Sequence, residues 1–285
     1  MNHLGKILVH LDDSHDGDLR LKVARQIVEM RTQLGGATCE IDAVYVTTPG
    51  YLTASMGYSE YSAGTVAILL EADEKRREQA KNRFDEWSSV PGPKVSWHSD
   101  IIDFPGISLL RHAWLADLIV FGQNNPSDPG MSTIPRNLIA NLIIDSGKPG
   151  LIVPYIGSMK STLQNVMIAW KPTREAAHAL SASIPLLQTA KTLHLVADVA
   201  ATDVEEFKRH FETYLRSNGV SLTPSFHSSF GADSGGEGLL SMASDVGADL
   251  LVMGCYGHSR AREFVLGGAS RTILQSMTLP VFMAH

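Results

Sequence analysis

Short apolar runs alternate with longer stretches of helical period along the chain. In the first half the runs occupy residues 6–11, 40–46, 95–101, 116–122 and 150–155, and the segments between them repeat apolar residues every three to four positions. Uninterrupted apolar strands separated by helices indicate a parallel sheet that is covered on both faces. Right-handed crossovers between such strands predict a doubly wound α/β sandwich.

The same order of landmarks occurs twice. ADLIVFG at 116–122 returns as ADLLVMG at 248–254, and each copy is followed by a turn-rich segment and an apolar run after a proline. Upstream, KILVHLDDS at 6–14 corresponds to NVMIAWKPT at 165–173. Self-similarity of this kind predicts two related domains. We place them at residues 1–156 and 163–285, with the small polar residues between them as a linker.

The first half carries an insertion. The two opening strands are 159 positions apart, whereas the glycines that end the two ADL runs are 132 apart, so the first half has 27 additional residues. We assign them to about 49–80, interpreted as a Gly-, Ser- and Tyr-rich loop before a helix that begins near Val66. Such a loop can be a lid or a surface insertion without a ligand role, and both alternatives stay open.

Composition narrows the possible partners. The chain is 44% hydrophobic, has no apolar run near the ~18 residues that a membrane span needs, and opens without the apolar core of a secretory signal, so a cytoplasmic protein off the membrane is expected. A net charge of −6 without a long basic run argues against nucleic-acid binding. Two cysteines and scattered histidines predict neither a disulfide framework nor a metal site.

Glycines near the C-terminal end suggest phosphate chemistry. Gly254 ends a predicted strand, where ligands settle in doubly wound sheets, and Gly254 and Gly257 would bring backbone N–H groups close to an anion. Residues 267–270 precede a predicted helix at 271–277, whose N-terminus suits a phosphate, and Arg260 and Arg262 could close on it. Glycines also end strands and cap helices, so the pattern alone fits a structural role equally well.

The spacing of Gly254, Gly257 and Gly267 resembles the nucleotide loop of the universal stress protein family, and the flanking runs ADLLVMG and LPVFMAH look like the strands around it. The resemblance covers nearly the whole chain as two consecutive copies. It implies two tandem Rossmann-like domains of the adenine nucleotide alpha hydrolase-like type, each with five parallel strands. It further implies ATP or ADP as ligand, with or without Mg²⁺, a role in stress survival, and a pseudo-dimer in which the last strands of the two halves pair antiparallel.

Departures from the family pattern favour the second half as the binding half. In the first half Asn125 and Arg136 stand where the family has glycines, and three prolines in that loop remove N–H donors, so we predict a degenerate site there. In the second half Gly268 stands where a Ser or Thr is usual, and Lys171 replaces the aspartate that Asp12 matches in the first half.

The resemblance therefore implies one nucleotide per chain. Trp170 in this site can instead be plain core, Lys171 a solvated turn residue, and Cys255 either a redox-sensitive or a buried thiol. The implied site consists of Ala169, Trp170, Lys171, Leu195, Met253, Gly254, Gly257, His258, Arg260, Gly267, Gly268, Ala269 and Ser270.

No nucleophile with a base and an orienting acid is recognisable, which favours a nucleotide-dependent regulatory or protective module with unidentified protein partners. The alternatives are a slow ATPase or phosphotransferase, and a binder of a non-nucleotide ligand beneath the insertion. Whether two chains form a homodimer is left open.

Overall fold

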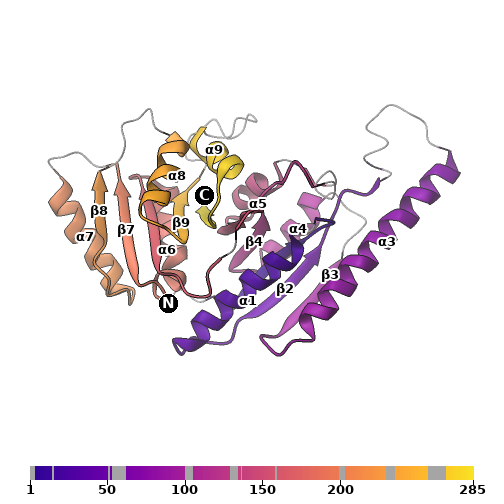
Figure 1. Cartoon of the computed structure of the whole chain (residues 1–285), viewed down its shortest axis with the longest axis horizontal. Coiled ribbons are helices and arrows are strands. Elements are labelled where there is room, and N and C mark those ends of the chain that lie inside the picture. Colours follow the sequence, from indigo (N-terminus) through magenta and orange to yellow (C-terminus); the bar gives the residue numbers. More distant parts are fainter. Residues whose placement is uncertain are drawn as a thin grey trace.

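The computed structural model describes residues 4–14, 16–50, 52, 62–99, 105–128, 134–135, 137–157, 159–198, 203–228, 235–255 and 268–285. A single sheet of ten strands runs through the molecule in the order β3-β2-β1-β4-β5-β10-β9-β6-β7-β8 (Figure 1). The strands are β1 (Lys6–Leu11), β2 (Glu40–Tyr45), β3 (Val95–Ser99), β4 (Leu118–Gly122), β5 (Gly150–Val153), β6 (Asn165–Trp170), β7 (Thr192–Ala197), β8 (Ser225–Ser228), β9 (Leu250–Gly254) and β10 (Val281–Ala284).

Helices cover both faces of the sheet, as the uninterrupted apolar strands predict. Side chains from α1, α3, α6 and α7 share one buried cluster with alternate strand residues, and side chains from α4, α5, α8 and α9 share the other. The helices are α1 (Gly17–Gln33), α3 (Ala63–Ser88), α4 (Pro105–Ala113), α5 (Leu138–Ser146), α6 (Arg174–Leu187), α7 (Val204–Ser217), α8 (Gly235–Asp245) and α9 (Gly268–Ser276). The predicted doubly wound α/β fold, with five parallel strands in each half, is confirmed.

The two halves join through their last strands. β5 and β10 pair antiparallel, with Leu151 opposite Phe282, whereas the other neighbouring strands pair parallel. The predicted intrachain pairing is therefore present. Because β10 runs against β5, the strands of the two halves point in opposite directions, and their carboxyl ends lie at opposite ends of the sheet.

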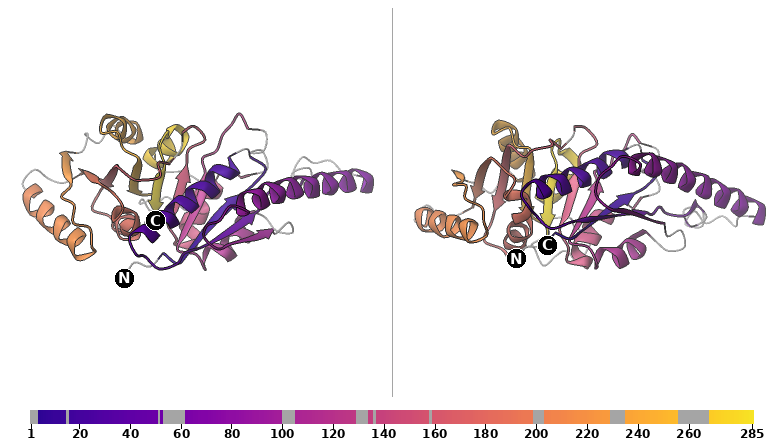
Figure 2. Two further views of the ribbon diagram at one scale, coloured as in Figure 1. Left: turned by 60° about the horizontal axis from the view of Figure 1, so that its bottom comes forward. Right: turned by 90° about the horizontal axis from the view of Figure 1, so that it is seen from below.

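Much of the insertion is helix. α3 has 26 residues, whereas its counterpart α7 has 14, and α3 begins at Ala63, where the Ser62 hydroxyl accepts a hydrogen bond from the Thr65 N–H. The prediction of a loop as far as Val66 was therefore wrong, because an N-cap serine starts the helix three residues earlier. α3 extends beyond the body of the sheet (Figure 2). The lid interpretation depends on residues 53–61, which lie outside the described residues.

The segment between the halves is anchored. Met159 and Leu163 belong to the buried cluster on the α1 and α6 side, and the Lys160 ammonium lies 2.5 Å from a carboxylate oxygen of Asp249. The proposed boundary at 156–163 stays a prediction, and this packing indicates that the segment is held against both halves.

Leu151 and Phe282 should be energetically coupled, since they are register partners across the junction and both are fully buried. Each alanine substitution should remove about 2–5 kcal/mol of unfolding free energy. The double variant should depart from additivity by about 0.5–3 kcal/mol, because both truncations open one shared cavity. Urea denaturation of the four proteins measures this. Leu151→Ala combined with Leu215→Ala on the distant α7 should be additive, and additivity in both pairs would contradict the junction.

Candidate functional site

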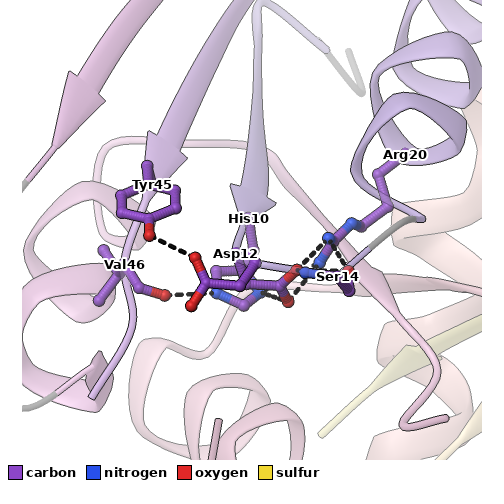
Figure 3. A network of polar contacts seen from close by, with 7 residues as sticks. His10, Asp12, Ser14, Arg20, Tyr45 and Val46 are labelled. Atoms are coloured by element: carbon purple, nitrogen blue, oxygen red, sulfur yellow. Dashed lines mark hydrogen bonds and ion pairs between the residues drawn. The ribbon is translucent and has the colours of Figure 1, made fainter. Parts of the chain in front are cut away.

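A buried ion pair closes the carboxyl end of β1 in the first half (Figure 3). The Arg20 guanidinium, from α1, donates to the Asp12 carboxylate at 2.9 Å from Nη1 and 2.6 Å from Nη2, and both side chains are 1% exposed. Burial alone would raise the pKa of Asp12, but the guanidinium outweighs burial and holds that pKa far below its usual range. Asp12 is thus fully ionised and bound internally.

Neighbouring groups complete this network. The Ser14 N–H donates to Asp12 Oδ1 at 2.9 Å, and Arg20 Nη2 donates to the Ser14 hydroxyl at 2.8 Å. His10 Nε2 lies 3.2 Å from the Val46 carbonyl, which assigns the ring proton to Nε2. Burial, against the opposing charge of Asp12, lowers the pKa of His10 to about 4, so the ring is neutral at pH 7.

Arg20 also occupies the position where a ligand would approach the first half. A Cβ on Gly122, the counterpart of Gly254, would lie 3.4 Å from Arg20 Cδ, so the arginine side chain lies against the end of β4. A cavity of about 10 Å³ lies between β1, α1 and α3, which is space for about one water molecule. The described part of the first half therefore offers little room for a ligand.

In the second half, the backbone of α6 fills the space beside Gly254, the counterpart of Gly122. A Cβ on Gly254 would lie 2.5 Å from the Ala176 nitrogen and 2.6 Å from the Glu175 carbonyl carbon, so the first turn of α6 packs directly on the end of β9. Only glycine permits this approach. This packing explains why residue 254 is a glycine, without any role in ligand binding. Any contact with phosphate has to come from the residues that follow.

Glu175 is a buried carboxylate that the sequence analysis missed. It is 3% exposed and accepts a hydrogen bond from Arg174 Nε at 2.6 Å. An acidic residue two positions after the N-cap Thr173 was a readable signal, because helix N-termini favour such residues. Burial, and then the Glu175 charge, raise the pKa of the Cys255 thiol well above its usual range. Cys255 is therefore the buried, inert thiol of the two alternatives.

The N-terminus of α9 is open on one side. α9 begins at Gly268, which is exposed, and among the described residues outside its own helix no atom lies within 4 Å of where its Cβ would stand. The predicted start at 271 was wrong, because residues 268–270 form the first turn. On its other side α9 packs on α8, since a Cβ on Gly236 would lie 2.6 Å from the Ala269 carbonyl oxygen. Ser270 is buried in this turn. The free N–H groups of the turn suit an anion.

The strand residues of the implied site divide between the two faces of the sheet. Ala169 and Met253 are register partners on the face under α8 and α9, whereas Trp170 and Leu195 belong to the face under α6 and α7. This division follows from the alternation of side chains along a strand. A ligand that contacts all four residues would have to lie across the end of the sheet.

Trp170 is largely a packing residue. Its ring lies 6.0 Å from that of Phe207 and 5.6 Å from that of Phe211, centroid to centroid, and both phenylalanines come from α7. This contact favours the core alternative for Trp170. Lys171, the next residue, is exposed, and its ammonium lies 3.9 Å from an Asp198 carboxylate oxygen. Such an exposed pair contributes little stability, so Lys171 can turn towards a ligand.

Several predicted groups cannot be placed. Gly257, His258, Arg260 and Gly267 lie outside the described residues, as does Arg262. Within the described ranges, no three histidine, cysteine or acidic side chains group closely enough to hold a metal ion. Among the described helices, none combines the length and apolar character that crossing a bilayer requires.

Comparison with known proteins relates the second half of the chain to one family. Residues 173–285 match the model of the universal stress protein family. That match contains α6, the glycine-ended β9 and the N-terminus of α9. Through this half, the chain is similar to the universal stress protein family.

Solved structures extend the likeness of fold to the whole chain. A universal stress protein from Archaeoglobus fulgidus is 16% identical over 99% of this chain and 97% of its own, with a TM-score of 0.68. A protein of unknown function from Pseudomonas aeruginosa is 17% identical over 99% and 93%, with a TM-score of 0.57. A universal stress protein in complex with cAMP is 19% identical over 44% and 98%, with a TM-score of 0.36 that is too low to bear on ligands. No curated protein matches the sequence.

The buried histidine should make stability depend on pH. The pKa of His10 is about 4 in the folded chain and about 6.5 when exposed, so the unfolded chain binds more protons between these values. Stability should therefore fall by about 3 kcal/mol as pH drops from 6.5 to 4. His10→Gln should remove most of this loss in urea denaturation across that range. His98→Gln, at a partly exposed position, should retain the loss, and a steep loss in His10→Gln would contradict the assignment.

The two counterpart glycines should tolerate alanine differently. Gly254→Ala forces a Cβ into the α6 backbone and should cost about 1–3 kcal/mol. Gly122→Ala meets only the side chain of Arg20 at 3.4 Å and should cost less than about 1 kcal/mol. Thermal and urea unfolding of both variants measure the difference. Equal costs would contradict the packing described for β9.

Proposed function

We propose that this chain is a member of the universal stress protein family, and that it is a stress-response protein that binds ATP or ADP in its second half and serves as a regulatory or protective module. One asymmetry carries the proposal: the family model matches residues 173–285, whereas the corresponding crevice of the first half is filled by its own Arg20–Asp12 pair. A nucleotide has one half of the chain in which to bind.

Three features of the second half support a nucleotide. The first turn of α9 presents N–H groups beside an open position at Gly268, which suits the phosphates. Lys171 adds an exposed cation near the end of β6, which can approach phosphate as a point charge. The loop between Cys255 and Gly268 carries the glycine spacing of the family and two arginines.

Binding would act as a switch through differential affinity. A nucleotide that contacts both α9 and the loop before it favours the conformation in which the two are held together, and it shifts the population towards that state. A surface altered in this way can be recognised by a protein partner. Hydrolysis is not required for this action, because binding energy alone supplies the shift.

The test is the nucleotide content of the purified chain. Protein prepared without added nucleotide is denatured, and any released nucleotide is identified and counted by liquid chromatography and mass spectrometry. We expect ATP or ADP at about one per chain, since one half is competent. Gly257→Glu should lose it, because a carboxylate in the loop repels phosphate.

A matched control distinguishes the halves. Asn125→Glu introduces the same charge at the counterpart position of the first half and should leave the nucleotide content unchanged. Absence of nucleotide together with no binding of ATP or ADP in calorimetry would overturn the proposal. Retention in Gly257→Glu with loss in Asn125→Glu would move the site to the first half, and ADP accumulating from added ATP would favour the slow ATPase.

A further inference from the structure

Two histidines face each other at the outer edge of the second half. His194 of β7 and His227 of β8 are partly buried, and their rings lie 5.4 Å apart between centroids. His194 Nδ1 and His227 Nε2 are separated by 3.2 Å. β8 is a four-residue edge strand that pairs with β7 alone. The two imidazoles therefore lie at the edge of the sheet, where β8 is paired with a strand on one side only.

The first half has a corresponding cluster, and there the chain supplies a cation. Ser96 and His98 lie on β3, and Asp42 of β2 is the register partner of Ser96. The Asp42 carboxylate accepts hydrogen bonds from the Lys6 ammonium at 2.9 Å and from the Ser96 hydroxyl at 2.5 Å, and it lies 3.9 Å from His98 Nε2. A lysine ammonium thus sits inside this cluster.

The second half keeps the arrangement and loses the cation. β3 reads Ser-Trp-His-Ser and β8 reads Ser-Phe-His-Ser, with His194 the register partner of Ser225 as Asp42 is of Ser96. At the position of Lys6 stands Asn165, whose amide donates instead to the carbonyls of Val246 and Gly247. The neutral imidazole of His194 thus replaces the Asp42 carboxylate and a neutral amide replaces the Lys6 ammonium, whereas His227 is the counterpart of His98.

We propose that His194 and His227 bind a divalent transition-metal ion of the zinc class between their facing ring nitrogens. Imidazole is a preferred ligand of Zn²⁺, with Zn–N bonds of about 2.0–2.1 Å. Two such bonds at a tetrahedral angle separate the nitrogens by about 3.3 Å, close to the 3.2 Å observed. Water completes the coordination on the open side of the edge.

The binding step conserves protons. The facing nitrogens share one hydrogen in the metal-free pair, since one must donate to the other. When both facing nitrogens bind the metal, each neutral ring carries its proton on its other nitrogen. One ring therefore changes its tautomer, and no proton is released. Burial, and then the neighbouring His227, lower the pKa of His194, so this ring is neutral and available at pH 7.

Zinc titration of the metal-free, untagged full-length chain tests the proposal, with no nucleotide present so that the result is independent of the nucleotide site. Calorimetry should show one Zn²⁺ per chain bound through this pair, and zinc should raise the unfolding temperature because only the folded chain aligns β7 with β8. His194→Gln and His227→Gln should each weaken this binding at least about tenfold.

His98→Gln is the matched control, because it removes the counterpart histidine from the first half. It should bind zinc as the wild-type chain does, and circular dichroism should show that all three variants are folded. The proposal is overturned if the wild-type chain binds no zinc, if either glutamine variant at the pair binds as tightly as wild type, or if zinc stabilises wild type and these variants equally.

Discussion

The antiparallel pairing of β5 with β10 is the constraint on which the rest of the molecule depends. It joins two five-stranded units into one sheet and leaves β3 and β8 as its edges. It also reverses the strand direction, so the carboxyl end of each half lies beside elements of the other. Gln123, just after β4, donates to the carbonyls of Leu274 and Gln275 near the end of α9. The carboxyl end of β4 in the first half is therefore in contact with an element of the second half.

The two crevices, at the carboxyl ends of the strands of each half, differ in the residues that fill them. Asp12 and Arg20 neutralise each other in a buried site, and removing one partner would leave an uncompensated buried charge. Such a pair is hard to displace with a ligand. In the second half the same space is bounded by the backbone of α6 and the buried carboxylate of Glu175, which leaves the α9 side open.

The pattern of apolar runs was sufficient to predict the strands and the two halves, because these depend on periodicity and on repeated segments. The pairing of β5 with β10 was implied by the resemblance to the universal stress protein family, and not by the pattern itself. The partner of Asp12 was not predictable, since Arg20 lies eight positions away on a helix and only the fold directs it to the crevice. Gly254 matched a binding pattern, yet its visible role is a contact with Ala176 that no local signal encodes. The first three residues of α3 fall in the predicted loop because glycine and small polar residues are typical of loops.

The exchange of Asp12 in the first half for Lys171 in the second half changes the charge that each half presents to a ligand. In the first half the aspartate is retained where an internal arginine neutralises it, so the site presents no unpaired charge to an incoming ligand. In the second half the aspartate is replaced by an exposed lysine with only a loose partner at 3.9 Å. An anion that approaches the molecule meets a buried, neutralised pair at one end of the sheet and the exposed Lys171 ammonium at the other. The exposed Lys171 is therefore the more accessible of these two cations to an anion, over the short range that salt screening sets.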